Sequence, residues 1–184
     1  MLNNFSIWLN KHIGKKEIII LFFLYAAILC VMSLLFIPAI RANTGEMNIF
    51  DLQAKGYSLE YAKDFIAAMG ENGKSVYLKA QLPLDFIYPA VYTLLYFGLA
   101  QKIFKKQHIL VFGVTAMLCV SDYMENSLSV VMLISNELTQ AVVSTASFFT
   151  VLKTALLYII TGLLIIGALY RLVKSTKRRA NDQI

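Results

Sequence analysis

The stretch that decides the fold is IIILFFLYAAILCVMSLLFIPAI, residues 18–40, which contains no Asp, Glu, Lys or Arg. About 20 predominantly apolar residues are enough for a helix to cross the hydrocarbon core of a bilayer. Three further apolar runs of span length follow, at roughly 84–101, 109–134 and 143–170. The pattern predicts an all-α, polytopic membrane protein, a four-transmembrane-helix bundle in which residues 1–184 form a single domain.

The composition agrees with a membrane protein. The 184 residues are 58% hydrophobic and 15% charged, whereas soluble domains average about 45–50% apolar and about 25% charged residues. A soluble enzyme and a disordered tail are therefore excluded. The run at 18–40 follows a basic start but is longer than the apolar region of a signal peptide, and no small-x-small cleavage site follows it, so we expect an uncleaved anchor.

The basic residues predict the orientation. Eleven of the seventeen Lys and Arg flank the expected spans on one side: Lys11, Lys15, Lys16, Lys102, Lys105, Lys106, Arg171, Lys174, Lys177, Arg178 and Arg179. By the positive-inside rule, both termini are cytoplasmic, and the 42–83 segment and the 135–142 loop face outward. We expect a location in the bacterial inner membrane, the plasma membrane of the cell. Because these charges are needed for orientation, nucleic acid is not an expected partner.

The outer segment 42–83 predicts a short amphipathic extracytoplasmic helix at about 58–70. Ser58 is a suitable N-cap and Gly70 a suitable end, and Asn72-Gly73 predicts a turn after it. The apolar stripe of this helix comprises Leu59, Ala62, Phe65, Ile66 and Met69. Two interpretations stay open, a lid on the outer end of the bundle or an anchor lying in the lipid interface.

Four ionisable residues fall inside the expected spans, namely Asp85, Asp122, Glu125 and Lys153. Each costs about 2.5–3.5 kcal/mol at the centre of a membrane helix, so such residues persist where they are paired or used. Counted at 1.5 Å per residue from the basic ends of their spans, all four lie about 21–27 Å deep. They therefore share one layer of the outer leaflet.

Helical periodicity predicts that polar side chains converge at this layer. The candidate ligand-binding residues are Asp85, Tyr88, Tyr92, Asp122, Glu125, Asn126 and Lys153, which lie on polar faces of three spans. We expect these faces to enclose an outward-opening polar pocket, because polar groups that face lipid stay unpaired. Asp85 lies nearest the polar end of its span, so we expect water to solvate it.

The cysteines and histidines predict no metal or cofactor site. Cys30 and Cys119 fall within spans and form no CxxC pair, and His12 and His108 lie at the cytoplasmic edge. A thiol-disulfide relay lacks its motif, and a b-type haem lacks a pair of histidines within the membrane.

Three strings resemble the pattern of a family of small, uncharacterised bacterial integral membrane proteins with four spans. They are GENGKSVYLKAQLPLDFIYPAVY at 70–92, SDYMENS at 121–127 and FFTVLK at 148–153. Their shared pattern is a Gly-x-x-Gly-basic turn, Asp before Pro-x-x-Tyr, Asp-x-x-Glu-Asn and Thr-x-x-Lys. The resemblance covers about half of the chain and implies the four-span fold, with no activity attached.

Three functions stay open. Three carboxylates against one lysine leave a surplus of acid, which protonation or a bound cation would relieve. The first function is a pocket that binds or transports a lipid headgroup or a small cationic or amphiphilic molecule. An intramembrane lipid-modifying enzyme is the second, with Asp122 or Glu125 as general acid or base and Lys153 stabilising developing charge. The third is an accessory structural subunit whose polar network only joins helices. Membrane lipids are expected partners, and a homo-oligomer stays open.

Overall fold

The computed structural model describes residues 11–104 and 108–181, which form helices and connecting segments without any strand. Within these residues, four helices are long and apolar enough to span a membrane by length and composition. Their ranges are Lys15–Asn43, Leu59–Phe104, Leu110–Ile134 and Gln140–Thr176. The all-helical class and the four long apolar helices predicted from the sequence are confirmed.

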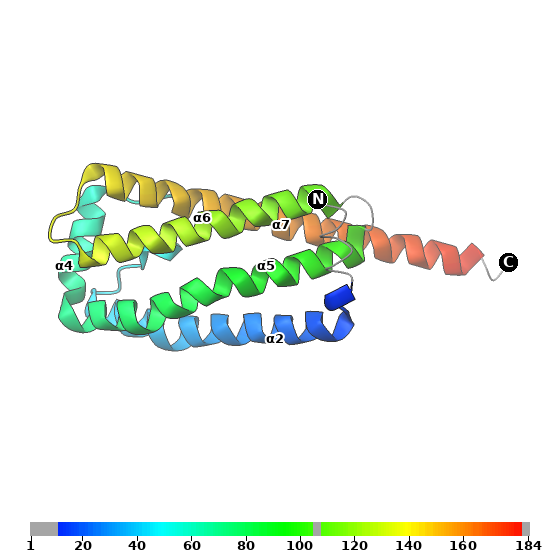
Figure 1. Ribbon diagram of the computed structural model, residues 1–184, viewed down its shortest axis with the longest axis horizontal. Helices are drawn as coiled ribbons and strands as arrows, with labels where there is room; N and C mark the ends of the chain where they lie inside the picture. The colour runs from blue at the N-terminus through cyan, green and yellow to red at the C-terminus, as the bar shows by residue number, and fades with distance from the viewer. Residues whose placement is uncertain (1–10, 105–107, 182–184) are drawn as a thin grey trace.

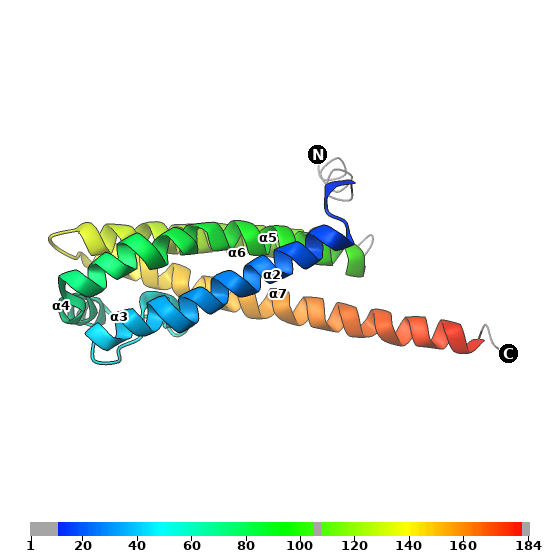
Figure 2. The same ribbon diagram turned by 90° about the horizontal axis from the view of Figure 1, so that it is seen from below.

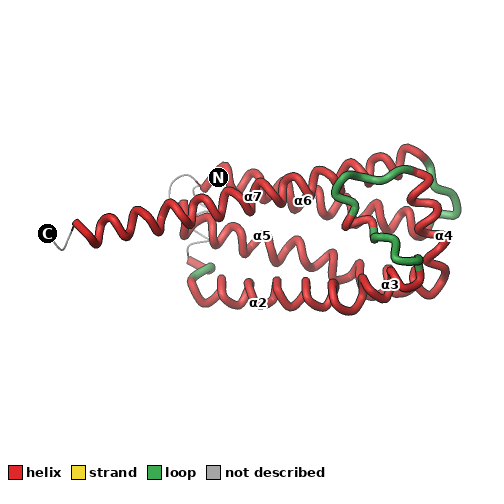
Figure 3. Tube along the Cα trace, turned by 180° about the vertical axis from the view of Figure 1, so that it is seen from behind, coloured by secondary structure: helices red, strands yellow, loops and turns green. Residues whose placement is uncertain are grey.

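The first long helix consists of α2 (Lys15–Val31), a π-helical turn η1 (Met32–Phe36) and α3 (Ile37–Asn43). The π turn ends two residues before Pro38, whose ring nitrogen has no hydrogen to donate to the preceding turn. After α3, the chain continues as an irregular segment, residues 44–58, which we call the strap. It contains one short 3-10 turn, η2 (Phe50–Leu52). Figure 3 shows the strap crossing from the end of α3 to the side of α7.

The second long helix begins with α4 (Leu59–Val76) and continues through η3 (Tyr77–Gln81) into α5 (Leu82–Phe104). Ser58 caps α4 as expected, because its hydroxyl accepts a hydrogen bond from the Tyr61 N–H at 3.1 Å. The expected apolar stripe is buried at Ala62, Phe65 and Met69. α4 therefore lies on protein and covers one end of the bundle (Figure 1).

Gly70 makes the sharp change of direction within α4. Its φ of 57° is a left-handed conformation that glycine adopts without steric cost. The turn predicted at Asn72–Gly73 is wrong, because the helix resumes directly after Gly70 and both residues are helical. The resumed helix places Tyr77, which is fully buried, against the underside of α4.

The remaining helices are α6 (His108–Ile134) and α7 (Gln140–Asn181). α2 packs on α5, α5 packs on α6 and α7, and α6 packs on α7. α2 begins and α7 ends at the same end of the bundle, opposite α4 (Figure 1). Figure 2 shows that α7 continues well beyond the other helices.

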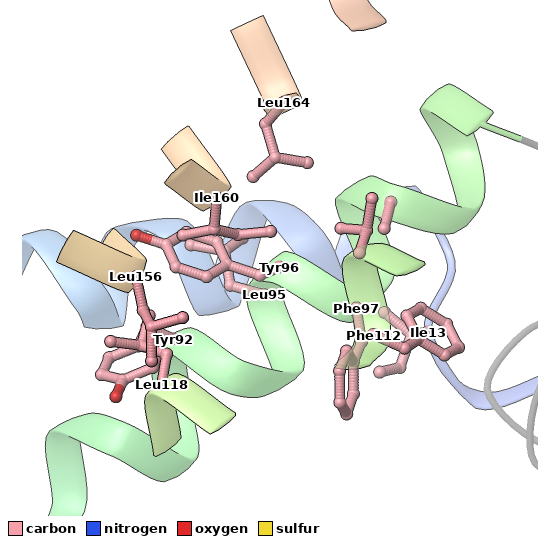
Figure 4. Close-up of a cluster of buried hydrophobic side chains, with 12 residues drawn as sticks. Ile13, Tyr92, Leu95, Tyr96, Phe97, Phe112, Leu118, Leu156, Ile160 and Leu164 are labelled. Atoms are coloured by element: carbon pink, nitrogen blue, oxygen red, sulfur yellow. The ribbon is translucent and has the colours of Figure 1, made fainter. Parts of the chain in front are cut away.

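Among the described residues, three apolar cores hold the bundle together, and the smallest, formed by Ile28, Met32 and Val91, joins the first long helix to α5. The other two are larger. The cap core, around α4 and the strap, comprises Ile40, Ile49, Phe50, Ala62, Phe65, Met69, Tyr77, Leu82, Met132, Leu133, Val143 and Ala146. The shaft core, toward the other end, comprises Ile13, Tyr92, Leu95, Tyr96, Phe97, Ala100, Val111, Phe112, Leu118, Leu156, Ile160 and Leu164 (Figure 4). Along α5, α6 and α7, the predicted polar residues other than Tyr92, which belongs to the shaft core, fall between these two larger cores.

Candidate functional site

Lys153 of α7 lies at the centre of the polar layer. Its Nζ is 2.5 Å from Asp51 Oδ1 and 3.6 Å from Asp122 Oδ1, and it forms a third, closer ion pair with Glu125 Oε2. Glu125 is fully buried, and Asp122 is buried as well. The structure thus brings together the three residues that the sequence offered as catalytic candidates.

Asp51, on the strap, is a member of this cluster that sequence reasoning missed. It lies in the outer segment 42–83, outside the predicted spans in which candidate site residues were sought. Its neighbours Ile49 and Phe50 are fully buried in the cap core, and this anchors the 3-10 turn that carries it. Burial raises the pKa of the Asp51 carboxyl, but the charge and hydrogen bond of Lys153 outweigh it and hold that pKa below its ordinary value of 3.8. Asp51 is therefore ionised at neutral pH.

Neutral donors complete the surroundings of the buried carboxylates. The Tyr92 hydroxyl donates to Asp122 Oδ2 at 3.0 Å, and Asn126 Nδ2 donates to Asp122 Oδ1 at 3.3 Å. The Thr150 hydroxyl donates to Glu125 Oε1 at 2.7 Å. Both oxygens of Asp122 and one oxygen of Glu125 thus accept hydrogen bonds from neutral donors, and the other oxygen of Glu125 is the one that pairs with Lys153.

Asn126 also supplies a hydrogen bond that the backbone of α5 lacks. In an α-helix, the Asp85 carbonyl accepts a hydrogen bond from the N–H four residues later, but that residue is Pro89, which has none. Asn126 Nδ2 donates to the Asp85 carbonyl instead, at 2.8 Å. This side chain therefore joins α6 to α5 where the proline interrupts the helical hydrogen bonds.

Asp85 differs from the other carboxylates of the layer. The expectation that water solvates it is wrong: only 4% of the residue is exposed, because η3 and the cap core extend the protein beyond it. Its carboxylate accepts one hydrogen bond, from Gln81 Nε2 at 3.0 Å. Among the described residues, no Lys, Arg or His forms an ion pair with it.

Gln81 is a second buried polar residue with an unused group. It is 0% exposed, and its amide nitrogen is engaged by Asp85. Its Oε1 has no hydrogen-bond partner within the described part of the chain. A buried acceptor without a partner is costly, so native structures normally supply one from protein, water or ligand.

A cavity of about 190 Å³ adjoins these residues. It is lined by Leu29, Met32, Ser33, Ile37, Asp51, Leu52, Gln81, Asp85, Tyr88, Tyr92, Leu118, Asp122, Lys153, Thr154 and Leu157. Five of the seven predicted ligand-binding residues are among them, whereas Glu125 and Asn126 lie behind the lining. The polar lining comes chiefly from the strap, η3, α5 and α7, with Asp122 from α6. The apolar lining comes from the first long helix, which supplies Leu29, Met32 and Ile37, and from one residue each of the strap, α6 and α7.

Carboxylate oxygens of Asp51, Asp122 and Glu125 lie within 4.8 Å of one another, a spacing that a metal ion could bridge. Lys153 Nζ contacts all three residues. The ammonium of Lys153 therefore takes the place that a cation would fill between them, and Asp85 is left as the carboxylate of the layer without an ion pair in the described chain.

Comparison with protein-family models, curated proteins and solved structures finds no match for this chain. The resemblance to small bacterial four-span membrane proteins stays a prediction.

Proposed function

We propose that this chain is an integral membrane protein whose buried acidic cavity binds a small cationic group. The observation that carries the proposal is Asp85, a buried carboxylate that lines the cavity and has no ion-pair partner among the described residues. A cationic ligand supplies the missing partner.

Membrane insertion is supported by the outer surfaces of the long helices. On the first of them, Phe23 is 66% exposed and Leu34 is 71% exposed. Apolar surface on this scale is unfavourable in water and is expected of residues that face lipid. We infer a bacterial inner membrane, with the basic ends of the helices in the cytoplasm and α4 outside.

The charge balance supports a cation as the ligand. Within the described residues, the polar layer holds four carboxylates, from Asp51, Asp85, Asp122 and Glu125, and one ammonium, that of Lys153, which pairs with all of them except Asp85. Isolated ionised carboxylates are strongly disfavoured away from water, and a bound cation relieves that cost. Among the described residues that line the cavity, Lys153 is the one cation that an anionic ligand could pair with, and its ammonium is already shared by three carboxylates.

The size of the cavity limits what it can hold. A cavity of about 190 Å³ is smaller than the roughly 300–1,000 Å³ of sites for drug-sized ligands. It is large enough for a headgroup-sized cation. The shaft core closes the bundle on one side of the cavity, since its side chains fill the space between α5, α6 and α7 (Figure 4). We therefore favour binding over conduction through the bundle.

The enzymatic alternative receives less support from this geometry. A general acid or base must reach the proton that it transfers. Glu125 lies behind the cavity lining, and both oxygens of Asp122 are engaged by protein donors. Lys153 is likewise held by three carboxylates, so no candidate catalytic group is free to act on a bound molecule.

Native mass spectrometry of the full chain, extracted in mild detergent, tests the proposal. We expect the wild type to carry a cationic molecule and Asp85→Asn to lack it. Asp64→Asn, which changes an exposed carboxylate on α4, is the matched control and should retain the ligand. Equal ligand occupancy in the wild type and in Asp85→Asn would contradict the proposal and would show that the acidic layer serves only to hold the helices together.

A further inference from the structure

We propose, on the basis of the proposed function, that the ligand is an amphiphile. Its head is an ammonium that still carries N–H bonds, and its hydrocarbon chain leaves the cavity between α2 and α7. The head is assigned from Asp85 and Gln81, and the path of the chain from the apolar side of the cavity.

Two acceptors of the cavity lining, the Asp85 carboxylate and the buried, unpartnered Gln81 Oε1, belong to neighbouring side chains. Asp85 and Gln81 are one helical turn apart and are joined by the hydrogen bond between Gln81 Nε2 and the Asp85 carboxylate. Asp85 lacks a cation and Gln81 Oε1 lacks a donor within the described residues. A primary ammonium satisfies both at once, because it carries a positive charge and several N–H donors. A quaternary ammonium supplies the charge but no donor.

Lys153 leaves this part of the cavity free. Its ion pairs are with Asp51, Asp122 and Glu125, and it forms none with Asp85. A ligand ammonium at Asp85 therefore does not have to displace Lys153. The tyrosine pair at Tyr88 and Tyr92, with ring centroids 5.3 Å apart, lines the same region and adds aromatic surface beside a cation.

The chain of the ligand follows the apolar side of the cavity. Leu29 on α2, Met32 at the start of η1 and Leu157 on α7 line that side. α2 packs mainly on α5, whereas α7 packs mainly on α6. The two helices that flank the proposed route are therefore held mainly by other helices and not by each other. Leu29 lines the cavity and is 40% exposed, so we place the exit of the chain at this residue. The opposite route, past α4, is filled by the cap core, in which Ile49 and Phe50 are fully buried.

Equilibrium binding to the full chain in nanodiscs of neutral lipid tests the inference with three probes: dodecylammonium, dodecyltrimethylammonium and ethylammonium. The two dodecyl probes share one chain, so their partition into the bilayer is similar. We expect dodecylammonium to bind about tenfold more tightly than dodecyltrimethylammonium, the factor that a hydrogen bond between charged and polar groups contributes. The preference should vanish in Gln81→Met, and dodecylammonium binding should vanish in Asp85→Asn but persist in Asp64→Asn.

The chain route is tested by side chains that fill it. Leu29→Trp should lose most of the dodecylammonium binding, whereas Leu24→Trp, on the exposed surface of α2 outside the cavity lining, should retain it. Equal binding of the two variants would overturn the route between α2 and α7.

Each remaining outcome is decisive. Asp85-dependent binding of ethylammonium as tight as that of dodecylammonium would overturn the amphiphile and leave the proposed cation site intact. Equal affinity for the two dodecyl probes would overturn the N–H requirement. Absence of binding by all three probes would overturn the proposed function itself. If Asp85→Asn does not fold, Gln81→Met provides the test of where the ligand ammonium binds. Loss of the preference for dodecylammonium in that variant supports the assignment, and an unchanged preference overturns it.

Discussion

At the scale of single residues, Lys153 supplies the one ammonium for Asp51, Asp122 and Glu125. Removing one partner of a buried ion pair typically costs about 3–5 kcal/mol, because the opposite charge is left uncompensated. We expect Lys153→Met to lower the free energy of unfolding in mixed micelles by that amount. Glu125→Gln should recover part of the loss in the Lys153→Met background, because it removes one of the stranded carboxylates.

An exposed lysine supplies the control for this measurement. Lys79→Met changes a residue at the surface of η3 and should shift the free energy of unfolding by less than about 0.5 kcal/mol. If Lys153→Met were as neutral as Lys79→Met, the ion pairs around Lys153 would contribute nothing to the fold.

Asp51 gives the same cluster a defined pH dependence. Burial raises the pKa of the Asp51 carboxyl, but the opposite effect of Lys153 is larger. The folded-state pKa of Asp51 therefore lies below 3.8. A carboxyl with a depressed folded-state pKa stabilises the protein above its unfolded-state pKa, and this contribution is lost as the pH falls through the folded-state value.

The corresponding measurement is the difference in unfolding free energy between wild type and Asp51→Asn. We expect a constant difference from neutral pH down to the unfolded-state pKa, followed by a decline as the pH falls below 3.8. A difference that vanished well above that value would contradict an ionised Asp51 bound to Lys153.

Among the helices, the junction of α5 and α6 depends on the pairing of Pro89 with Asn126. Asn126→Ala removes the donor that serves the Asp85 carbonyl, and an unsatisfied buried carbonyl costs about 1–3 kcal/mol. We expect Pro89→Ala to recover part of that loss, because alanine restores the backbone N–H that α5 lacks.

A double-mutant cycle in unfolding free energy isolates this effect. Pro89→Ala should be more favourable in the Asn126→Ala background than in the wild type, with a coupling of about 0.5 kcal/mol or more. Strict additivity would show that the Asn126 side chain does not substitute for the missing backbone donor.

The strap has one position where only glycine fits. Gly56 has a φ of 83°, and a Cβ there would lie 2.7 Å from the Ser147 hydroxyl, which accepts the Tyr57 N–H at 2.8 Å. We expect Gly56→Ala to detach the strap from α7 and to increase hydrogen exchange across residues 44–58. Gly113→Ala is the control, since a Cβ at Gly113 meets nothing within 4 Å and exchange in the strap should stay unchanged.

Patterns within one helix were predictable from the sequence, and contacts between distant segments were not. The faces carrying Asp85, Asp122 and Lys153 follow from helical periodicity, because neighbours three and four residues apart lie together. Asp51 contacts Lys153 across 102 residues of sequence. No local pattern predicts that contact, although the apolar neighbours of Asp51 indicate that its turn is anchored in protein.

At the scale of the whole molecule, a polar layer lies between two apolar cores, and the cavity adjoins that layer. The even number of long apolar helices places the beginning of α2 and the end of α7 at one end, as Figure 1 shows. The basic residues at that end predict its cytoplasmic location. Orientation and oligomeric state stay predictions, because both depend on surroundings outside the chain.

The central claim, that a ligand cation rests against Asp85, is tested most directly by solid-state NMR of the protein in lipid. Dipolar coupling between ¹⁵N-labelled dodecylammonium and ¹³C-labelled aspartate carboxyl carbons reports their separation. We predict a coupling that corresponds to about 4 Å, the separation expected for a direct ion pair, and its loss in Asp85→Asn but not in Asp64→Asn. A coupling that persists in Asp85→Asn, or no coupling to any aspartate in the wild type with the probe bound, would contradict the account.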